Sequence, residues 1–239
     1  YSAMADIQQA WIETLRRESG IRRAIILHGE ILDVYPSPRN NQDYVPIQPI
    51  VCTTLRSKGF SDIILWDTFE GVKNIKPERW EELQKGMMSP NAKDKSSDPK
   101  AKPYDMGDVS LDDTQQSAQG AVPPNIDDFL AVVHFYLTHQ TQSRIAFILD
   151  WSQYLFTSNA SLSEEDRKRL LMLSKSINNA PLSFRSKEEM SSPDNLLILI
   201  ASKLESIPSV FYQGSACVKD IIVTGPGRSE REAFLDREQ

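Results

Sequence analysis

Five apolar runs are spaced along the chain, and together they predict a buried sheet. Each run is six or seven residues long and rich in Ile, Leu or Val. None alternates apolar and polar residues with a period of two, so each is expected to be covered on both faces, like strands of a parallel sheet under helices. The runs are RAIILH at 23–28, DIILWD at 62–67, RIAFILD at 144–150, NLLILIA at 195–201 and DIIVTG at 220–225.

Helical patterns separate these runs. In two of these helical patterns, Asn125 and Ser163 are the expected N-caps. Each is followed by acidic residues that suit a first helical turn. The four patterns lie at 6–19, 47–60, 125–141 and 161–178. The alternation predicts an α/β fold, with a doubly wound, mainly five-stranded parallel sheet and helices on both faces.

The domain organisation follows from length and local composition. The chain has 239 residues, of which 40% are hydrophobic and 25% charged, and we expect one core over residues 4–235. Residues 86–124 are polar and rich in Pro and Ser, which predicts a disordered insertion. Residues 1–3 precede Met4 and are expected to be a remnant of expression. The charged ending SEREAFLDREQ suggests a fragment of something longer.

Charge and cysteine usage exclude several classes of function. The formal net charge of −6 disfavours nucleic acid and anionic membranes as partners. No apolar run reaches the roughly 20 residues of a membrane span, and no signal peptide is evident, so we expect a cytoplasmic protein. Cys52 and Cys217 lack His or Cys neighbours at ligand spacing, and we expect both to be reduced core residues rather than metal ligands.

Candidate binding residues stand where three runs end. The carboxyl ends of parallel strands are where ligands bind in open α/β sheets. Asp150 could contact a metal or nucleotide there, although a cap for the following turn is the favoured interpretation. Asp67 could reach a ribose, and His28 with Gly29 ends the first strand. These four residues are weak candidates for cofactor binding, and no catalytic or metal-binding residue is predicted.

The loop after the first run lacks the features of a phosphate site. Such a site uses a Gly-rich loop whose N–H groups surround phosphates, completed by Lys and Ser or Thr. The sequence here is GEILDVYPSPRNNQDY, in which Gly29 is the only glycine and no Lys follows before Lys58. Glu30 and Asp33 would repel a triphosphate.

The C-terminal part carries a family resemblance. Residues 195–235, NLLILIASKLESIPSVFYQGSACVKDIIVTGPGRSEREAFL, resemble the sensor strand, connecting region and last core strand of AAA+ ATPases. Pro226, Glu230 and Arg231 have the spacing of the motif that leads into the lid helix of that family. The segment IAFILDW at 145–151 looks like its Walker B strand. The resemblance implies a P-loop NTPase-like core without its lid.

The departures from the family pattern are as informative. The Gly-rich loop is missing, and Trp151 stands where the second Walker B acid is expected. Ala201-Ser202-Lys203 replaces the sensor motif, and only Lys219 is cationic where arginine fingers are expected. The resemblance therefore implies a degenerate, non-hydrolysing domain without a cofactor, with ATP and Mg²⁺ serving a second, intact domain of a longer ATPase. It also implies protein partners or a homo-oligomer formed through AAA+-type faces.

Two other hypotheses stay open at this point. The first is a sensor that binds a nucleotide or small anion near Gly29, Asp67 and Asp150 without cleaving it. Specific binding without turnover would favour it. The second is a small-molecule enzyme of the α/β class, for which no pair of nucleophile and base emerges from the sequence.

Overall fold

A computed structural model describes residues 10–37, 43–88, 125–157, 161–183, 192–193, 195–225 and 235. Its centre is a six-stranded sheet with the spatial order β10-β1-β9-β6-β4-β5. All neighbouring strands are parallel except β5, which runs antiparallel to β4. The strands are β1 (Ala24–Gly29), β4 (Phe60–Asp67), β5 (Gly71–Lys73), β6 (Arg144–Leu149), β9 (Leu196–Ala201) and β10 (Val218–Val223). The five predicted runs form the five parallel strands, which confirms the predicted fold class.

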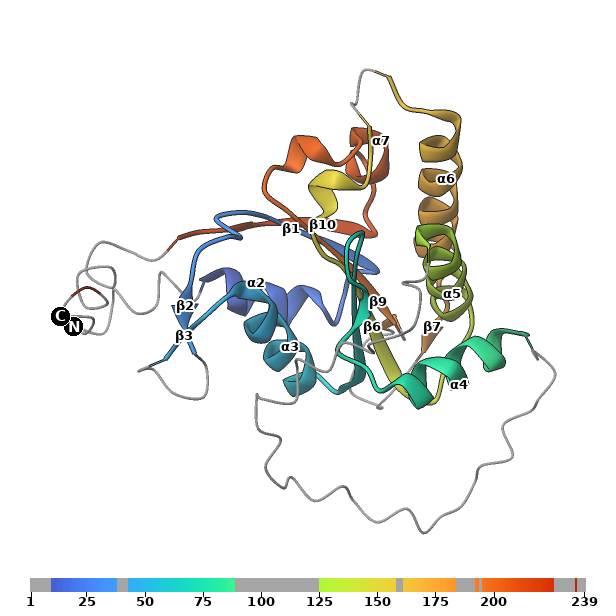
Figure 1. Cartoon of the computed structure of the whole chain (residues 1–239), viewed down its shortest axis with the longest axis horizontal. Helices are drawn as coiled ribbons and strands as arrows, with labels where there is room; N and C mark the ends of the chain where they lie inside the picture. Colours follow the sequence, from blue (N-terminus) through green and yellow to red (C-terminus); the bar gives the residue numbers. More distant parts are fainter. Residues whose placement is uncertain are drawn as a thin grey trace, which may run out of the picture.

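Helices cover both faces of the sheet. Figure 1 shows α2 and α3 together on one side, and α5 and α6 on the other. The helices are α2 (Ala10–Glu18), α3 (Ile47–Ser57), α4 (Pro77–Met88), α5 (Ile126–Thr138), α6 (Glu164–Asn178) and α7 (Ser209–Tyr212), with short 3₁₀ turns η2 (Ser152–Tyr154) and η3 (Leu204–Ser206). Two small hairpins complete the fold, β2 (Tyr35–Pro36) with β3 (Tyr44–Val45), and β7 (Leu182–Ser183) with β8 (Ser192–Pro193).

The strands in the middle of the sheet are mostly apolar because each divides its side chains between two cores. The prediction that every run is covered on both faces is wrong for the edge strand β10, in which Asp220 and Ile222 are exposed. In β1, Ala24 and Ile26 pack with α5, α6 and α7, whereas Ile25 and Leu27 pack with α2 and α3. All six residues of β6 and of β9 are buried. Burial of a Leu or Ile side chain contributes about 1.5–3 kcal/mol. The buried strands therefore form a rigid sheet that fixes the starting points of the loops at its carboxyl edge.

Local sequence signals set the starts of two helices. The Asn125 side chain accepts a hydrogen bond from the Asp127 N–H, and Ser163 Oγ accepts one from the Asp166 N–H at 3.1 Å. Both predicted N-caps are confirmed. None of the helices in the described ranges is long and apolar enough to span a bilayer.

Helix α4 was not predicted from the sequence, and its end enters the segment predicted to be a polar insertion. Residues 86–88 form its last turn, and the rest of that segment, 89–124, lies outside the described residues. Gly86 allows a close contact here, because a Cβ atom at this position would lie 2.7 Å from the Tyr136 hydroxyl. That hydroxyl donates a 2.6 Å hydrogen bond to the Leu83 carbonyl and ties α4 to α5.

Candidate site at the carboxyl edge of the sheet

The sheet brings Asp67 and Asp150 together and places the other two candidates, His28 and Gly29, at a separate point of the edge. Trp66 of β4 pairs with Leu149 of β6, so Asp67 and Asp150 follow at neighbouring positions of the edge. Strand β9 separates them from β1, which carries His28 and Gly29. The candidates thus form two groups with separate surroundings.

Asp67 stabilises the turn between β4 and β5. Its Oδ1 accepts hydrogen bonds from the N–H groups of Phe69 at 2.8 Å and Glu70 at 2.7 Å, and its Oδ2 lies 2.7 Å from Lys73 Nζ. Burial alone would raise the pKa of this carboxyl, but Lys73 and the two N–H groups outweigh burial and hold the pKa below its ordinary value of 3.8. Only 5% of Asp67 is exposed, so both carboxylate oxygens are engaged within the protein.

Asp150 is also buried, but its partners are neutral. Gln48 Nε2, from the first turn of α3, lies 3.3 Å from Oδ1 and 3.1 Å from Oδ2, and the Trp151 N–H donates to Oδ1 at 3.0 Å. Burial raises the pKa of Asp150 above its ordinary value of 3.8, and the N–H of Trp151, Lys73 and Gln48 only partly offset this. Asp150 therefore links β6 to α3 and caps the turn after the strand.

Trp151 adopts an unusual backbone conformation directly after this acid. Its φ of 53° and ψ of 40° lie in the left-handed region. For a bulky side chain this conformation costs about 1–2 kcal/mol relative to the right-handed one. The indole is 38% exposed and its ring centroid lies 6.4 Å from that of Tyr154. The turn thus directs two aromatic side chains toward the surface.

Gly29 and His28 are held by the strands beside them. Gly29 has a φ of +114°, and a Cβ atom there would lie only 2.6 Å from the Val223 carbonyl oxygen. The His28 ring lies beside the strand β10, with Nε2 at 3.2 Å from Asp220 Oδ2. The need for glycine at position 29 therefore comes from the close passage of the chain against β10.

Several N–H groups of the loop after β1 donate hydrogen bonds to other groups of the protein. Gly29 donates to the Ser202 carbonyl at 3.3 Å, Glu30 to the Val223 carbonyl at 3.0 Å and Ile31 to the Gly29 carbonyl at 2.8 Å. The N–H of Val34 donates to Asp33 Oδ1 at 2.9 Å. A phosphate would need such N–H groups unbonded and aimed at one point. In the described part of this loop, the N–H groups of Gly29, Glu30, Ile31 and Val34 are therefore not available to a phosphate.

Helix α3, the next helix along the chain, gives little compensation. It begins at Ile47 after Pro46, and Pro49 also lies in its first turn. Proline has no N–H, so two of the positions that could donate to an anion at this helix end lack a donor. The described residues of this loop and helix therefore do not fit the phosphates of ATP. In the described ranges no group of three or more His, Cys, Asp or Glu residues is arranged to hold a metal ion.

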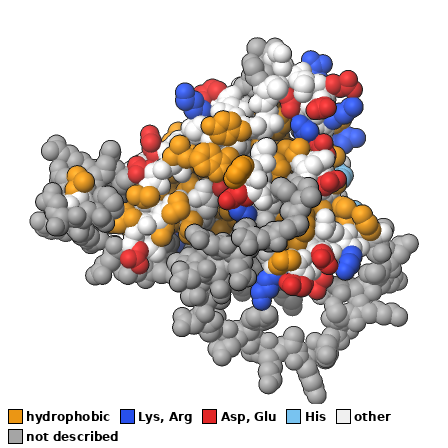
Figure 2. Space-filling view, viewed as in Figure 1, with side chains coloured by type: hydrophobic (Ala, Val, Ile, Leu, Met, Phe, Trp, Pro, Cys, Tyr) orange, Lys and Arg blue, Asp and Glu red, His pale blue; other side chains and the backbone are white. Residues whose placement is uncertain are grey.

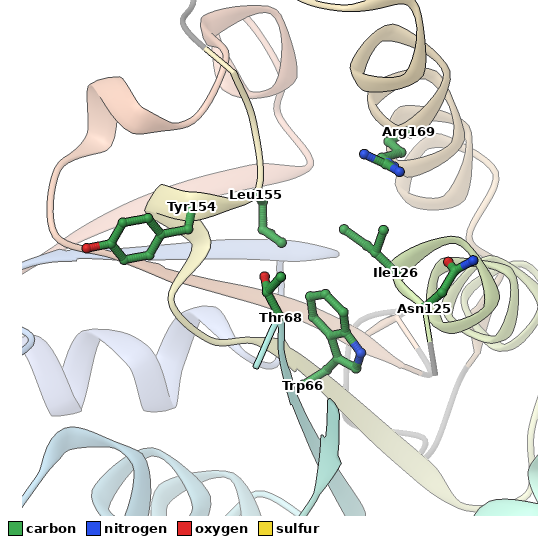
Figure 3. A pocket seen from close by; sticks show the side chains of 7 residues that line it. All are labelled: Trp66, Thr68, Asn125, Ile126, Tyr154, Leu155 and Arg169. Atoms are coloured by element: carbon green, nitrogen blue, oxygen red, sulfur yellow. The ribbon is translucent and has the colours of Figure 1, made fainter. Parts of the chain in front are cut away.

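A pocket of about 310 Å³ lies beyond the ends of β4 and β6. Figure 3 shows Trp66, Ile126 and Leu155 around its centre, with Arg169 above and the Tyr154 ring turned away. The remaining lining residues are Thr68 and Asn125. Arg169 lies 2.8 Å (Nε) and 3.2 Å (Nη2) from the two carboxylate oxygens of Asp127. The sequence did not predict this pocket, because its walls come from four separate segments without a shared motif.

Residues 7–224 match the model of the family described as the AAA+ chaperone, N-terminal Rossmann-like domain. The chain belongs to this family. Membership confirms the resemblance to AAA+ proteins and agrees with the mostly parallel sheet. The chain is thus an N-terminal domain of the AAA+ chaperone kind. The carboxyl edge described above is the edge at which Rossmann-like sheets bind ligands.

Other comparisons give little beyond the family. A chain of the solved structure described as "Structure of E. coli MS115-1 HORMA:CdnC:Trip13 complex" aligns over 95% of this chain and 55% of its own length, with 11% identity and a TM-score of 0.41. The present chain thus spans about half of that chain. No curated protein matches it closely enough to count as a relative.

Proposed function

We propose that this N-terminal domain is a non-hydrolysing scaffold and protein-interaction module of its AAA+ chaperone. The observation that carries the proposal is the state of the loop after β1. Four of its described N–H groups are bonded to Ser202, Val223 and the loop itself, and Glu30 and Asp33 add negative charge to the loop. In this proposal ATP and Mg²⁺ act in another domain of the chaperone.

The second support is the loss of the acid–base chemistry around Asp150. Hydrolysis of ATP needs a Mg²⁺ ligand together with a residue that positions the attacking water. Asp150 is 4% exposed and held by Gln48, and the next residue is the aromatic Trp151. We therefore assign Asp150 a structural role, as the link between β6 and α3. Without catalysis at this edge of the sheet, its surface can contact other proteins.

An ATPase assay on the whole chaperone tests this proposal. We expect Asp150→Asn to leave ATP turnover within about twofold of wild type. Removal of a group that stabilises transition-state charge would instead lower turnover by about a hundredfold or more, and that result would contradict the proposal. Asp166→Asn is the matched control, because Asp166 is equally buried, at 3% exposure, but bonds to Thr157 before α6.

A further inference from the structure

Large apolar side chains are exposed at the carboxyl edge of the sheet. Of the eleven large hydrophobic residues that are exposed in the described ranges, five lie in the segments that follow β1, β4 and β6. We call these five the edge patch: Leu32, Val34, Phe69, Trp151 and Tyr154. Phe69 is 90% exposed and Tyr154 73%, which is costly for aromatic side chains unless another surface covers them.

Two of the three segments that carry the edge patch, those after β1 and β6, are linked. Turn η3 contacts both β1 and η2, so the ends of β1 and β6 are bridged at the end of β9. Figure 2 shows hydrophobic side chains gathered near the centre of the view, over η2. Trp151, with its left-handed backbone, directly precedes η2, and its indole is 38% exposed. Strained backbone that persists at a loop is a common sign of a functional position.

Tyr154 joins the edge patch to the pocket. It lines the pocket together with Leu155 and Ile126, which supply apolar walls. The volume of about 310 Å³ is at the lower end of the roughly 300–1,000 Å³ of ligand pockets. A space of this size and polarity suits one large apolar side chain of a partner.

The charge around this surface selects the partner. Glu30, Asp33 and Asp128 form no ion pair among the described residues. The neighbouring cations are largely neutralised, since Lys73 pairs with Asp67 and Glu70, and Arg169 with Asp127. Lys203, at the end of β9, is an exposed exception. Glu30 and Asp33 lie beside Gly225, beyond β10, and alternate in sequence with Leu32 and Val34 of the edge patch. The acidic charge is therefore at the β1 end of the edge patch, where it favours a cationic partner.

We propose that the edge patch and the adjoining pocket bind a protein segment that presents one or two large apolar side chains flanked by Lys or Arg. This inference rests on the proposed interaction function and names the surface and the chemistry of the partner. The apolar residue of the segment fills the pocket beside Tyr154, and its basic residues face Glu30 and Asp33 at the β1 end of the edge patch. Aromatic anchors in pockets usually carry most of the binding free energy, and the acidic charge adds orientation.

Selection from a random dodecapeptide phage library on the purified chain tests this inference. We expect enriched peptides to combine Phe, Trp, Leu or Met with Lys or Arg. A fluorescently labelled enriched peptide should bind the double variant Phe69→Ser/Tyr154→Ser at least about tenfold more weakly, because the variant lacks two large aromatic contacts. The control is Leu171→Ser/Val210→Ser, which removes two exposed apolar side chains elsewhere, 57% and 72% exposed, and should change binding less than about twofold. Added salt should weaken binding.

Each contrary outcome has a distinct meaning. Selection of acidic peptides, or no selection at all, would overturn the inference. Binding that survives Phe69→Ser/Tyr154→Ser would place the interaction on another surface and leave the proposed function standing. Self-association that this variant abolishes would identify a second copy as the occupant and also overturn it. Nucleotide titration judges the proposed function separately. Circular dichroism of both double variants establishes that they remain folded.

Discussion

The end of β1 and the ends of β4 and β6 lie on the same edge of the sheet but differ in which of their polar groups are engaged within the protein. After β1, the backbone N–H groups that could face an anion bond to Ser202, Val223 and the loop itself. After β4 and β6, the acids remain, but Asp67 is tied to Lys73 and Asp150 to Gln48. In the first region the engaged groups are backbone N–H donors, whereas in the second they are carboxylates that link parts of the fold. A residue type retained at a ligand edge is thus no guide to chemistry until its partners are known.

The two acids also differ from each other. Both are about 95% buried, yet the pKa of Asp67 is lowered and that of Asp150 is raised. The difference comes from the partners, because Lys73 is a cation and Gln48 is neutral. Asp67 therefore stabilises the fold as a charged group, whereas ionisation of Asp150 opposes folding.

The largest effect is expected at the β1 end. Gly29→Ala adds a Cβ atom against the Val223 carbonyl at a positive φ, and should lower the free energy of unfolding by about 3 kcal/mol. Gly59→Ala is the control, because Gly59 has a φ of +86° but no atom within 4 Å of the added Cβ, and should cost about 1 kcal/mol. Urea denaturation measures both. Equal costs would show that close passage against β10 does not constrain the loop.

The next effect tests the structural role of Asp67 at the β4 end. Asp67→Ala removes the acceptor of two N–H groups and the partner of Lys73, and should cost about 2–3 kcal/mol of unfolding free energy. Asp67→Asn keeps an oxygen for the turn and should cost less. Chemical denaturation of both variants gives the comparison. If Asp67→Ala lowered the unfolding free energy by less than a typical surface substitution does, the structural role of Asp67 would be refuted.

Asp150→Asn should change the unfolding free energy by no more than about 1 kcal/mol, because an amide oxygen still accepts from Gln48 or Trp151 and a buried charge is removed. Denaturation at neutral pH measures it. A large stabilisation would show that the fold tolerates Asp150 at a cost, as a functional group would require, and would count against the structural role.

The smallest effects are in pH dependence, where the acids should act with opposite signs. The pKa of Asp67 is lowered in the fold, so its contribution is present above 3.8 and is lost as pH falls through the folded value. The pKa of Asp150 is raised, so its contribution is present below 3.8 and is lost as pH rises through the folded value. Unfolding free energies of wild type, Asp67→Asn and Asp150→Asn between about pH 2 and pH 6 measure this. Differences of the same sign would contradict the assignment.

The sequence predicted the parts of the fold that depend on local pattern. The five parallel strands arise from apolar runs, although β10 leaves Asp220 and Ile222 exposed. Asn125 and Ser163 cap helices through neighbours two or three residues away. Strand β5 was missed because it has only three residues, and α4 because only Leu83 among its residues is fully buried.

The site was less predictable because its contacts are long-range. Adjacent strand ends place Asp67 beside Asp150, which the parallel sheet could suggest. The bond between Gln48 and Asp150 joins residues 102 positions apart, and no local pattern marks it. The pocket likewise depends on how η2, α5 and α6 pack, so Tyr154 and Arg169 carried no signal in the sequence.

Calorimetric titration of the purified chain with ATP and with ADP, each with and without Mg²⁺, tests the central claim most directly. We predict no saturable heat at millimolar nucleotide, because four described N–H groups of the loop after β1 and both acids are engaged within the protein. Saturable, Mg²⁺-dependent binding that Asp150→Asn abolishes would contradict the claim and show that the acid at the end of β6 holds a metal ion.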